Sequence, residues 1–300
     1  MKIGFIGCVE SSFVALECLL TDSALVGEIE VVSVITKPNS KGNSDFVDLT
    51  GLCKKKNIPY YEYSGGGQDK SIAFMETYSP DVIYCVGWSH ILPREFIELP
   101  EYGIIGFHPA ELPKNRGRHP IIWALALGLE STASTFFKMD ESADSGPILS
   151  QEPVGISTED NARSLYDKIL ALIPAQVRGF TLALSAKSAV FKEQDHELSN
   201  EWRKRSRKDG IIDWRMHAED IRNLIRALCP PYPGAELYIC GQPHQVYSAK
   251  IHNGILGKNI EPGRVLFKEG ANFCVKCGGG SAIWITKFKA DKLPAIGDCL

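Results

Sequence analysis

The sequence predicts an α/β domain with a parallel sheet, followed by a smaller β-rich domain. In the first half, short and almost wholly apolar runs alternate with helical segments, as expected for strands buried on both faces; the runs are KIGFIG, EVVSVIT, DVIYCVG and GIIGFH. The last 100 residues instead contain five short strand-like runs separated by glycine turns, which is typical of a small barrel or sandwich. A polar segment without a core pattern separates the two parts. We therefore expect one domain at 1–195, a linker at 196–210 and a second domain at 211–300.

The elements follow from periodicity and from helix-ending residues. Helices are expected at SSFVALECLL (11–20), 45–56, 120–128, 160–185 and 218–228. Pro120 can start the third of these helices, and Pro174 is expected to kink the fourth. Further strands are expected at TASTFFKM, ILSQEP, AELYIC, QVYSAKI, GRVLF, FCVKC and AIWITKF.

Composition indicates an ordinary globular protein of 300 residues, with 44% hydrophobic and 23% charged residues. No apolar run is long enough for a membrane span, and the N-terminal run is interpreted as a strand, not as a signal peptide. Nine scattered cysteines indicate a reducing compartment, so we expect a cytoplasmic protein. Cys274 and Cys277 form one CxxC without nearby histidines, and we expect no metal.

The net charge of −3 conceals an uneven distribution. Residues 1–200 carry 17 Lys+Arg and 26 Asp+Glu, whereas residues 201–300 carry 16 and 10. Five of the six residues in the run Arg203 to Lys208 are basic. A basic region of this kind either contacts a polyanion or forms a solvated surface, and the sequence leaves both possibilities open.

The turn after the first strand does not carry a dinucleotide-binding pattern. GFIGCVES has the spacing G-x-x-G instead of G-x-G-x-x-G, and no acidic residue ends the second strand. No Walker A pattern is present either. These observations disfavour a nicotinamide-dependent dehydrogenase.

Two loops carry the strongest candidates for chemistry. The first, HPAELPKNRGRHP, begins with His108 at the end of a predicted buried strand; the second, MDESADSGPIL, contains Asp144. A histidine titrates near neutral pH, and a nearby carboxylate can fix its tautomer and stabilise its cation. Taken singly, His108 could be a hydrogen-bonded strand-end histidine, and Asp144 could be a turn former.

Together, the two loops resemble those of the formyltransferases that use 10-formyltetrahydrofolate. The shared layout is H-P-x-x-L-P-x-x-R-G-x-x-P followed by M-D-x-x-x-D-x-G, and GIIDW, IRNLIRAL and PYPGA are similar to the opening of the C-terminal domain in the tRNA and sugar branches of the family. The resemblance covers nearly the whole chain. It implies a Rossmann-like formyltransferase domain, a small OB-like C-terminal domain and a homodimer.

The resemblance also assigns catalytic positions. His108 and Asp144 fall on the family's catalytic histidine and aspartate, whereas Gly106 occupies the position of its catalytic asparagine. Either Asn115, His119, a backbone N–H or a water then replaces that asparagine, or the site is weakened, and we include Asn115 among the expected catalytic residues. Glu111 is a second departure, at a position where the family often has leucine.

Binding residues follow from the same resemblance. The folate is expected against two loops, at Trp88, His90, Ile91, Leu92, Met139, Asp140, Glu141 and Ala143. The amine substrate, which accepts the formyl group, is expected against the turn after the first strand and the basic loop, at Cys8, Glu10, Ser11, Arg116 and Gly117. Core packing is the alternative for Ile91, Leu92 and Met139, and helix capping is the alternative for Arg116 and Gly117.

The expected reaction is direct attack of an amine on the formyl carbon, without a covalent enzyme intermediate. His108 would stabilise the tetrahedral oxyanion, and Asp144 would orient His108 and assist proton removal. The preferred acceptor is a nucleotide-linked amino sugar, and the alternatives are methionyl-tRNA or a protein that binds ligand without catalysis. The basic run favours tRNA, but the resemblance implies a long basic insertion after the second strand in the tRNA branch. Here that segment, ITKPNSKGNSDFVDLTGL, is short with two lysines, and the chain as a whole is acidic, so nucleic acid is not the expected partner.

Overall fold

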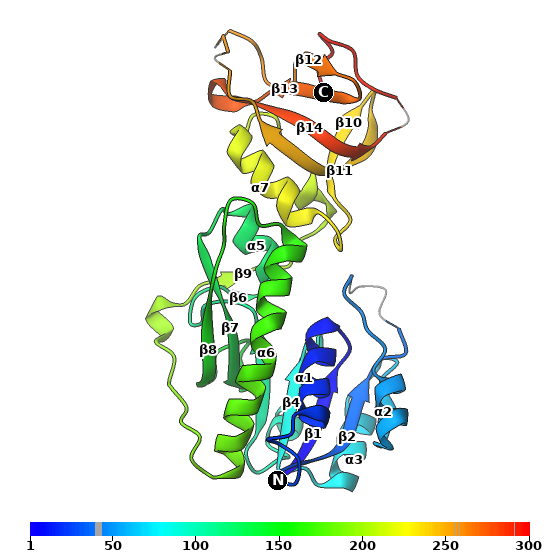
Figure 1. Cartoon of the computed structure of the whole chain (residues 1–300), viewed down its shortest axis with the longest axis vertical. Helices are drawn as coiled ribbons and strands as arrows, with labels where there is room; N and C mark the ends of the chain where they lie inside the picture. The colour runs from blue at the N-terminus through cyan, green and yellow to red at the C-terminus, as the bar shows by residue number, and fades with distance from the viewer. Residues whose placement is uncertain (40–43, 255, 258, 291) are drawn as a thin grey trace. The chain divides into compact units, whose positions relative to one another are not determined.

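The structure, a computed structural model, describes residues 1–39, 44–254, 256–257, 259–290 and 292–300 (Figure 1). Residues 40–43, within the segment after the second strand, lie outside the described residues. The chain forms two compact units that each combine separate stretches of sequence. Unit 1 comprises Met1–Gly117, Thr132–Val154 and Asp167–Trp202, and unit 2 comprises Arg118–Ser131, Gly155–Tyr166 and Arg203–Leu300.

Unit 1 is built on a seven-stranded sheet in the order β3-β2-β1-β4-β5-β7-β8. Its strands are β1 (Lys2–Gly7), β2 (Glu30–Thr36), β3 (Tyr60–Glu62), β4 (Val82–Val86), β5 (Ile104–His108), β7 (Ser131–Lys138) and β8 (Ile148–Gly155). The first five in this order are parallel, whereas β7 runs antiparallel to β5. The Rossmann-like α/β prediction is confirmed, with a sheet that is mixed beyond β5.

Helices cover both faces of this sheet, as the apolar strands predict. They are α1 (Glu10–Thr21), α2 (Thr50–Lys56), α3 (Asp69–Tyr78), α4 (Arg94–Ile97) and α6 (Ala162–Ser185). On one face, residues of α1 and α6 such as Leu16 and Phe180 pack in one core cluster with Phe5 of β1. On the other face, Met75 of α3 and Phe96 of α4 pack in a second cluster. Two apolar layers therefore hold the strand ends in place.

The helix expected at 45–56 begins later, at Thr50. Its expected first turn makes backbone hydrogen bonds to the turn after β1: Glu10 donates to Asp45 at 3.0 Å, and Val47 donates to Cys8 at 3.0 Å. Asp48 then accepts the Thr50 N–H at 2.8 Å. These long-range bonds compete with helix formation over 45–49, which is why periodicity alone misplaced the start.

Unit 2 contains a five-stranded antiparallel sheet in the order β10-β11-β14-β13-β12, as predicted for the C-terminal part. The strands are β10 (Ala235–Ile239), β11 (Gln242–Ile251), β12 (Val265–Glu269), β13 (Asn272–Lys276) and β14 (Ala282–Lys289), with the short η3 (Gly278–Gly280) before β14. Helix α7 (Ala218–Leu228) contacts both α5 (Pro120–Ala126) and β11. Among the described residues, no helix has the length and apolar character required to cross a bilayer.

The segment predicted to be a linker contains three short elements. They are η1 (His196–Leu198), β9 (Glu201–Trp202) and η2 (Arg207–Gly210). Within unit 1, β9 pairs in parallel with β6 (Arg116–Gly117). The polar segment therefore contacts the loop that follows His108.

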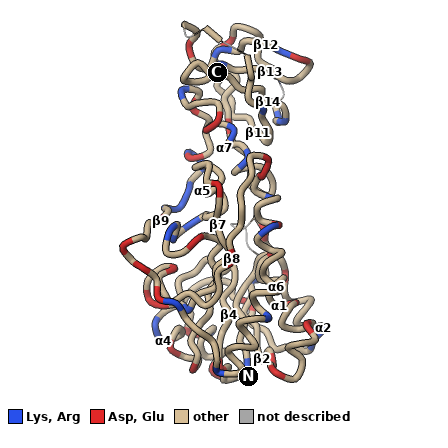
Figure 2. The backbone as a smooth tube through the Cα atoms, turned by 60° about the vertical axis from the view of Figure 1, so that its left-hand side comes forward, with Lys and Arg blue, Asp and Glu red and all other residues tan. Residues whose placement is uncertain are grey.

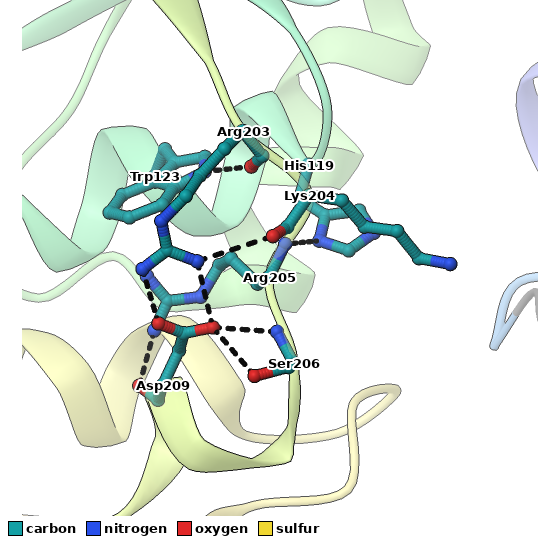
Figure 3. Close-up of polar contacts among 7 residues, drawn as sticks. All are labelled: His119, Trp123, Arg203, Lys204, Arg205, Ser206 and Asp209. Carbon is teal, nitrogen blue, oxygen red and sulfur yellow. Dashed lines mark hydrogen bonds and ion pairs between the residues drawn. The ribbon is translucent and has the colours of Figure 1, made fainter.

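The basic run after β9 is partly neutralised within unit 2 (Figure 3). The Arg203 and Arg205 guanidinium groups lie 5.4 Å and 4.4 Å from the centre of the Trp123 ring, consistent with cation–π attraction. Asp209 accepts hydrogen bonds from the Arg203 guanidinium group and from the Ser206 N–H at 2.6 Å. The Arg203 side chain and the Ser206 N–H hold the pKa of Asp209 well below its usual range. Figure 2 shows basic residues as blue segments beside α5.

This network predicts a pH-dependent contribution to stability. Because the pKa of folded Asp209 is lowered, its contribution is present above the unfolded-state pKa of about 3.9 and is lost as the pH falls below it. We expect Asp209→Asn to lower the free energy of unfolding at pH 7 by about 1 kcal/mol, after allowing for solvent screening. Urea unfolding at pH 7 and pH 3 measures this, with the exposed Glu269→Gln as control. A difference between wild type and Asp209→Asn that grows at pH 3 would contradict the expected sign.

Candidate active site

His108 is the last residue of β5 and is 5% exposed. Its Nε2 lies 2.7 Å from the Asn115 carbonyl oxygen, and its Nδ1 lies 3.6 Å from Oδ2 of Asp144. A carbonyl oxygen only accepts, so Nε2 carries a hydrogen in this arrangement. A doubly protonated ring would donate toward both acceptors. The two loops proposed from the sequence therefore meet at His108.

Asp144 is held in an unusual backbone conformation. Its φ is 54°, in the left-handed region, and Oδ2 accepts the Gly117 N–H at 2.9 Å. Two residues later, a Cβ on Gly146 would lie 1.8 Å from the Lys138 carbonyl oxygen of β7. The glycine of the D-S-G sequence thus lets the Asp144 loop approach the backbone of β7.

The loop from 109 to 117 is fixed by its neighbours in unit 1. Thr135 of β7 donates to the Ala110 carbonyl at 2.7 Å, and Gln151 of β8 donates to the Leu112 carbonyl at 3.0 Å. Asn115, with a φ of 64°, donates its N–H to the Asn200 side chain at 2.9 Å. The structure thus brings Asn115 to His108 through its backbone carbonyl, whereas the sequence singled it out for its side chain.

The polar segment after α6 supplies residues that sequence reasoning missed. Gln194, 5% exposed, accepts a hydrogen bond from Arg116 Nη2 at 2.7 Å. The Nδ1 of His196 lies 3.1 Å from the same nitrogen, and the Arg116 N–H donates to the Asn200 carbonyl at 3.0 Å. Arg116 is therefore bound on several sides, and its interpretation as a simple helix cap does not describe these contacts. The buried Gln194 in a polar, aperiodic stretch carries no periodic signal that a sequence reading could use.

The expected folate residues fall on two neighbouring loops. Leu92 is 3% exposed, whereas Ile91 is 89% exposed, so core packing describes Leu92 and not Ile91. Met139 packs against the same core cluster as Leu92, which places the loops side by side. Arg94 of α4 pairs with Glu141 at 3.3 Å.

Polar and aromatic contacts shape these two loops. The Trp88 and His90 rings lie 5.6 Å apart, and both contact Tyr63. In the other loop, Asp140 accepts from the Ser145 hydroxyl at 2.6 Å, and Ala143 is exposed. Aromatic, apolar and polar groups thus meet at this edge of the sheet.

The turn after β1 is tightly packed. Cys8 and Ser11 are 0% and 3% exposed, and Glu10 is half-buried. Ser12 donates to the Val86 carbonyl at 2.6 Å and accepts from the Cys8 N–H at 3.0 Å. These bonds join the carboxyl ends of β1 and β4, the type of position where α/β sheets bind ligands.

Gly106 sits against β7. It pairs with Phe137, and a Cβ at this position would lie 2.8 Å from Met139 Cγ and 3.0 Å from Phe137 Cζ. These two side chains occupy the space that a larger residue would need. His119, named as another substitute for the family's asparagine, accepts the Arg205 N–H at 3.3 Å within unit 2. Burial lowers the pKa of His119, and the positive charges of Arg118, Arg205 and Lys204 lower it further.

This packing predicts the effect of restoring an asparagine. Gly106→Asn should lower the free energy of unfolding by about 1–3 kcal/mol, because Met139 and Phe137 must both move. Adding Met139→Ala should recover part of this loss. Urea unfolding of the two variants, with Met139→Ala alone as control, measures both effects. Unchanged stability of Gly106→Asn would contradict the packing described here.

The described residues contain no group of three or more His, Cys, Asp or Glu placed to hold a metal ion. Cys274 and Cys277 of the CxxC are buried, and burial raises the pKa of each thiol to about 12. Thiols with such a pKa stay protonated at neutral pH.

Comparison with known proteins decides the family. A family model described as formyl transferase matches residues 1–177, and one described as formyl transferase, C-terminal domain, matches residues 204–296. The chain belongs to the formyltransferase family. The family resemblance seen in the two loops is thereby confirmed, and the protein is a formyltransferase enzyme.

Individual relatives in this family differ in acceptor. The methionyl-tRNA formyltransferase of Geotalea daltonii is 30% identical over 288 residues, which cover 94% of this chain and 89% of that protein. The structure of WlaRD, a sugar 3N-formyltransferase with dTDP and 5-N-formyl-THF, has a TM-score of 0.72 at 19% identity, covering 98% of this chain and 99% of its own. The Helicobacter canadensis N-formyltransferase, in complex with folinic acid and dTDP-3-aminofucose, has a TM-score of 0.73 at 17% identity, covering 95% and 98%. At these identities the structural matches show the formyltransferase fold.

Proposed function

We propose that this formyltransferase moves the formyl group of 10-formyltetrahydrofolate to the amine of a nucleotide-linked amino sugar. The observation that carries the chemistry is the His108–Asp144 pair, 3.6 Å apart at the end of β5. Two relatives of the same fold are described with folates and with dTDP or a dTDP-amino sugar, which supports this pair of substrates. The short segment after β2, with two lysines, supports a sugar acceptor over tRNA.

In the proposed reaction, the unprotonated amine attacks the formyl carbon and forms a C–N bond. The carbonyl electrons move to oxygen, and a tetrahedral oxyanion results. His108, when protonated, stabilises that oxyanion once the oxyanion replaces the Asn115 carbonyl as the acceptor of its Nε2–H; one donor of this kind contributes about 3–4 kcal/mol in other enzymes. Asp144 orients the imidazole and receives the proton that the attacking amine loses, directly or through water. The bond from the formyl carbon to N10 then breaks as N10 takes up the proton held by Asp144, directly or through water, giving the formamide and tetrahydrofolate.

Substrate binding is proposed at the two neighbouring loops and the basic loop. The folate would lie against 88–92 and 139–143, where aromatic rings, the exposed Ile91 and backbone groups meet. Arg116 and Gly117, together with the turn at Cys8 to Ser11, would contact the amino sugar that accepts the formyl group. We also propose a cytoplasmic homodimer, as expected from the cysteine content and the family.

Methionyl-tRNA is the second candidate acceptor. Two observations favour it: the 30% identical relative carries that name, and five of six residues in the run Arg203 to Lys208 are basic. Within unit 2, however, Asp209 pairs with Arg203, and Glu236 pairs with Arg207 at 2.8 Å, which reduces the charge available to phosphates.

A panel assay tests the proposal. The protein is incubated with 10-formyltetrahydrofolate and, in separate reactions, with UDP-, dTDP- or GDP-linked 4-amino sugars or with charged methionyl-tRNA, and mass spectrometry follows the gain of one formyl group. We expect a gain on at least one nucleotide sugar. A formyl gain on charged methionyl-tRNA alone would overturn the proposed sugar acceptor. No gain on any acceptor would favour a protein that binds its ligands without catalysis.

A further inference from the structure

Gln194 bridges the two loops that meet at His108. Its side-chain nitrogen donates to the carbonyl oxygens of Asp144, at 2.9 Å, and of Gly146, at 2.6 Å. Its side-chain oxygen accepts from Nη2 and Nε of Arg116, at 2.7 Å and 3.3 Å. The residue is 5% exposed, and all its side-chain polar capacity is directed at these two loops.

These bonds close a ring with the catalytic carboxylate. Gln194 donates to the Asp144 carbonyl, and the Asp144 carboxylate accepts the Gly117 N–H at 2.9 Å. Gly117 is covalently joined to Arg116, whose side chain donates to Gln194 and closes the ring. Asp144 adopts a left-handed φ of 54°, which a residue with a side chain rarely holds without support from its surroundings. The ring supplies support on both sides of that residue.

We propose that Gln194 is a positioning residue that sets the place of the Asp144 carboxylate relative to His108. The role rests on the proposed formyl transfer, in which Asp144 receives the proton of the amine. The side-chain hydrogen bonds of Gln194 go to Arg116, Asp144 and Gly146. It acts through the Asp144 backbone and through the segment that carries Arg116 and Gly117.

Only a carboxamide of this length satisfies the site. Glutamate would keep the acceptor for Arg116 but would set a carboxylate oxygen against two carbonyl oxygens. Methionine has a similar length and shape but can neither donate to the carbonyls nor accept well from the guanidinium group. The two variants therefore separate loss of the donor from loss of both functions.

A double-mutant comparison distinguishes positioning from a general structural role. Gln194→Met should lower kcat about 10- to 100-fold in the wild-type background, because small displacements of a catalytic group cost rates of this order. In the Asp144→Asn background the same change should lower kcat by less than about 3-fold, because the group it positions is already lost. The KM for folate should change by less than about 3-fold in either background. An equal fold-loss in both backgrounds would overturn the inference.

The matched control is Glu193→Gln, the exposed neighbour of Gln194, which should leave kcat unchanged. Gln194→Asn keeps the carboxamide but is too short to reach both loops, and it provides a second variant should Gln194→Met not fold. We expect the Asn and Glu variants to lose activity as well. Wild-type activity in Gln194→Asn would contradict the proposed bridge.

Hydrogen exchange tests the bridge without any substrate. The Gly117 N–H is held by Asp144, so its exchange in the folded protein should rise by about 10-fold or more in Gln194→Met if the ring opens. An unchanged exchange rate of the Gly117 N–H in Gln194→Met would contradict the inference even if the wild-type protein transfers formyl groups. Absence of transfer by the wild type would instead reject the proposed function, and the exchange result would still show whether Gln194 holds the loop.

Discussion

Asp144→Asn should lower kcat for formyl transfer by about 10²- to 10⁴-fold, the usual contribution of a positioned acid or base. Asparagine can still accept the Gly117 N–H, which Asp144 accepts at 2.9 Å, so the loop should keep its place. It cannot take a proton from the amine or balance the charge of a protonated His108 3.6 Å away. Folate affinity should therefore change by less than about 3-fold. Steady-state kinetics and calorimetry measure the two quantities.

His108→Ala should show the same separation between turnover and binding, with a loss of similar size. Glu152→Gln, an exposed carboxylate on β8, is a control that should retain full turnover. Equal losses of turnover and of folate affinity in the two active-site variants would contradict the account. Such a result would mean that His108 and Asp144 shape the pocket without taking part in the reaction.

The second large effect is expected at Gly146. Gly146→Ala should lower the free energy of unfolding by about 3 kcal/mol, because its Cβ would lie 1.8 Å from the Lys138 carbonyl oxygen. That oxygen belongs to the backbone, and the Lys138 N–H also donates to Pro147 at 2.8 Å, so neither segment can move alone. Turnover should fall as well, because the displaced loop carries Asp144.

Gly179→Ala is the matched control. Gly179 lies on the exposed side of α6, and a Cβ there meets nothing within 4 Å. Alanine should stabilise the helix by about 0.5–1 kcal/mol. Urea unfolding of both variants makes the comparison, and a Gly146→Ala protein as stable as wild type would show that the close approach to β7 is wrong.

Much of the fold is predictable because burial imposes a period on the sequence. Helix α7 occupies Ala218–Leu228, the range predicted from its amphipathic pattern, and the five C-terminal strands fall on the predicted runs. The meeting of His108 and Asp144 was also predictable, since each lies in a loop of the recognised motif and His108 ends a buried strand.

Other features depend on partners far away in the chain. The 45–49 stretch forms backbone bonds to the turn after β1 in place of a helical turn, and no local pattern announces this. The direction of β7 follows from its pairing with β5, which a strand's own composition does not encode. Gln194 escaped detection for the same reason: its importance lies in two loops about 50 and 78 residues away, as its bonds show.

Competition between acceptors tests whether the protein formylates a nucleotide-linked amino sugar. A dTDP-linked amino sugar and charged methionyl-tRNA are mixed at equal concentration with a limiting amount of 10-formyltetrahydrofolate labelled in the formyl group. Wild-type protein should transfer the label to the sugar nucleotide, and Asp144→Asn should transfer almost none. Label found mainly on methionyl-tRNA, or transfer that persists in Asp144→Asn, would contradict this prediction.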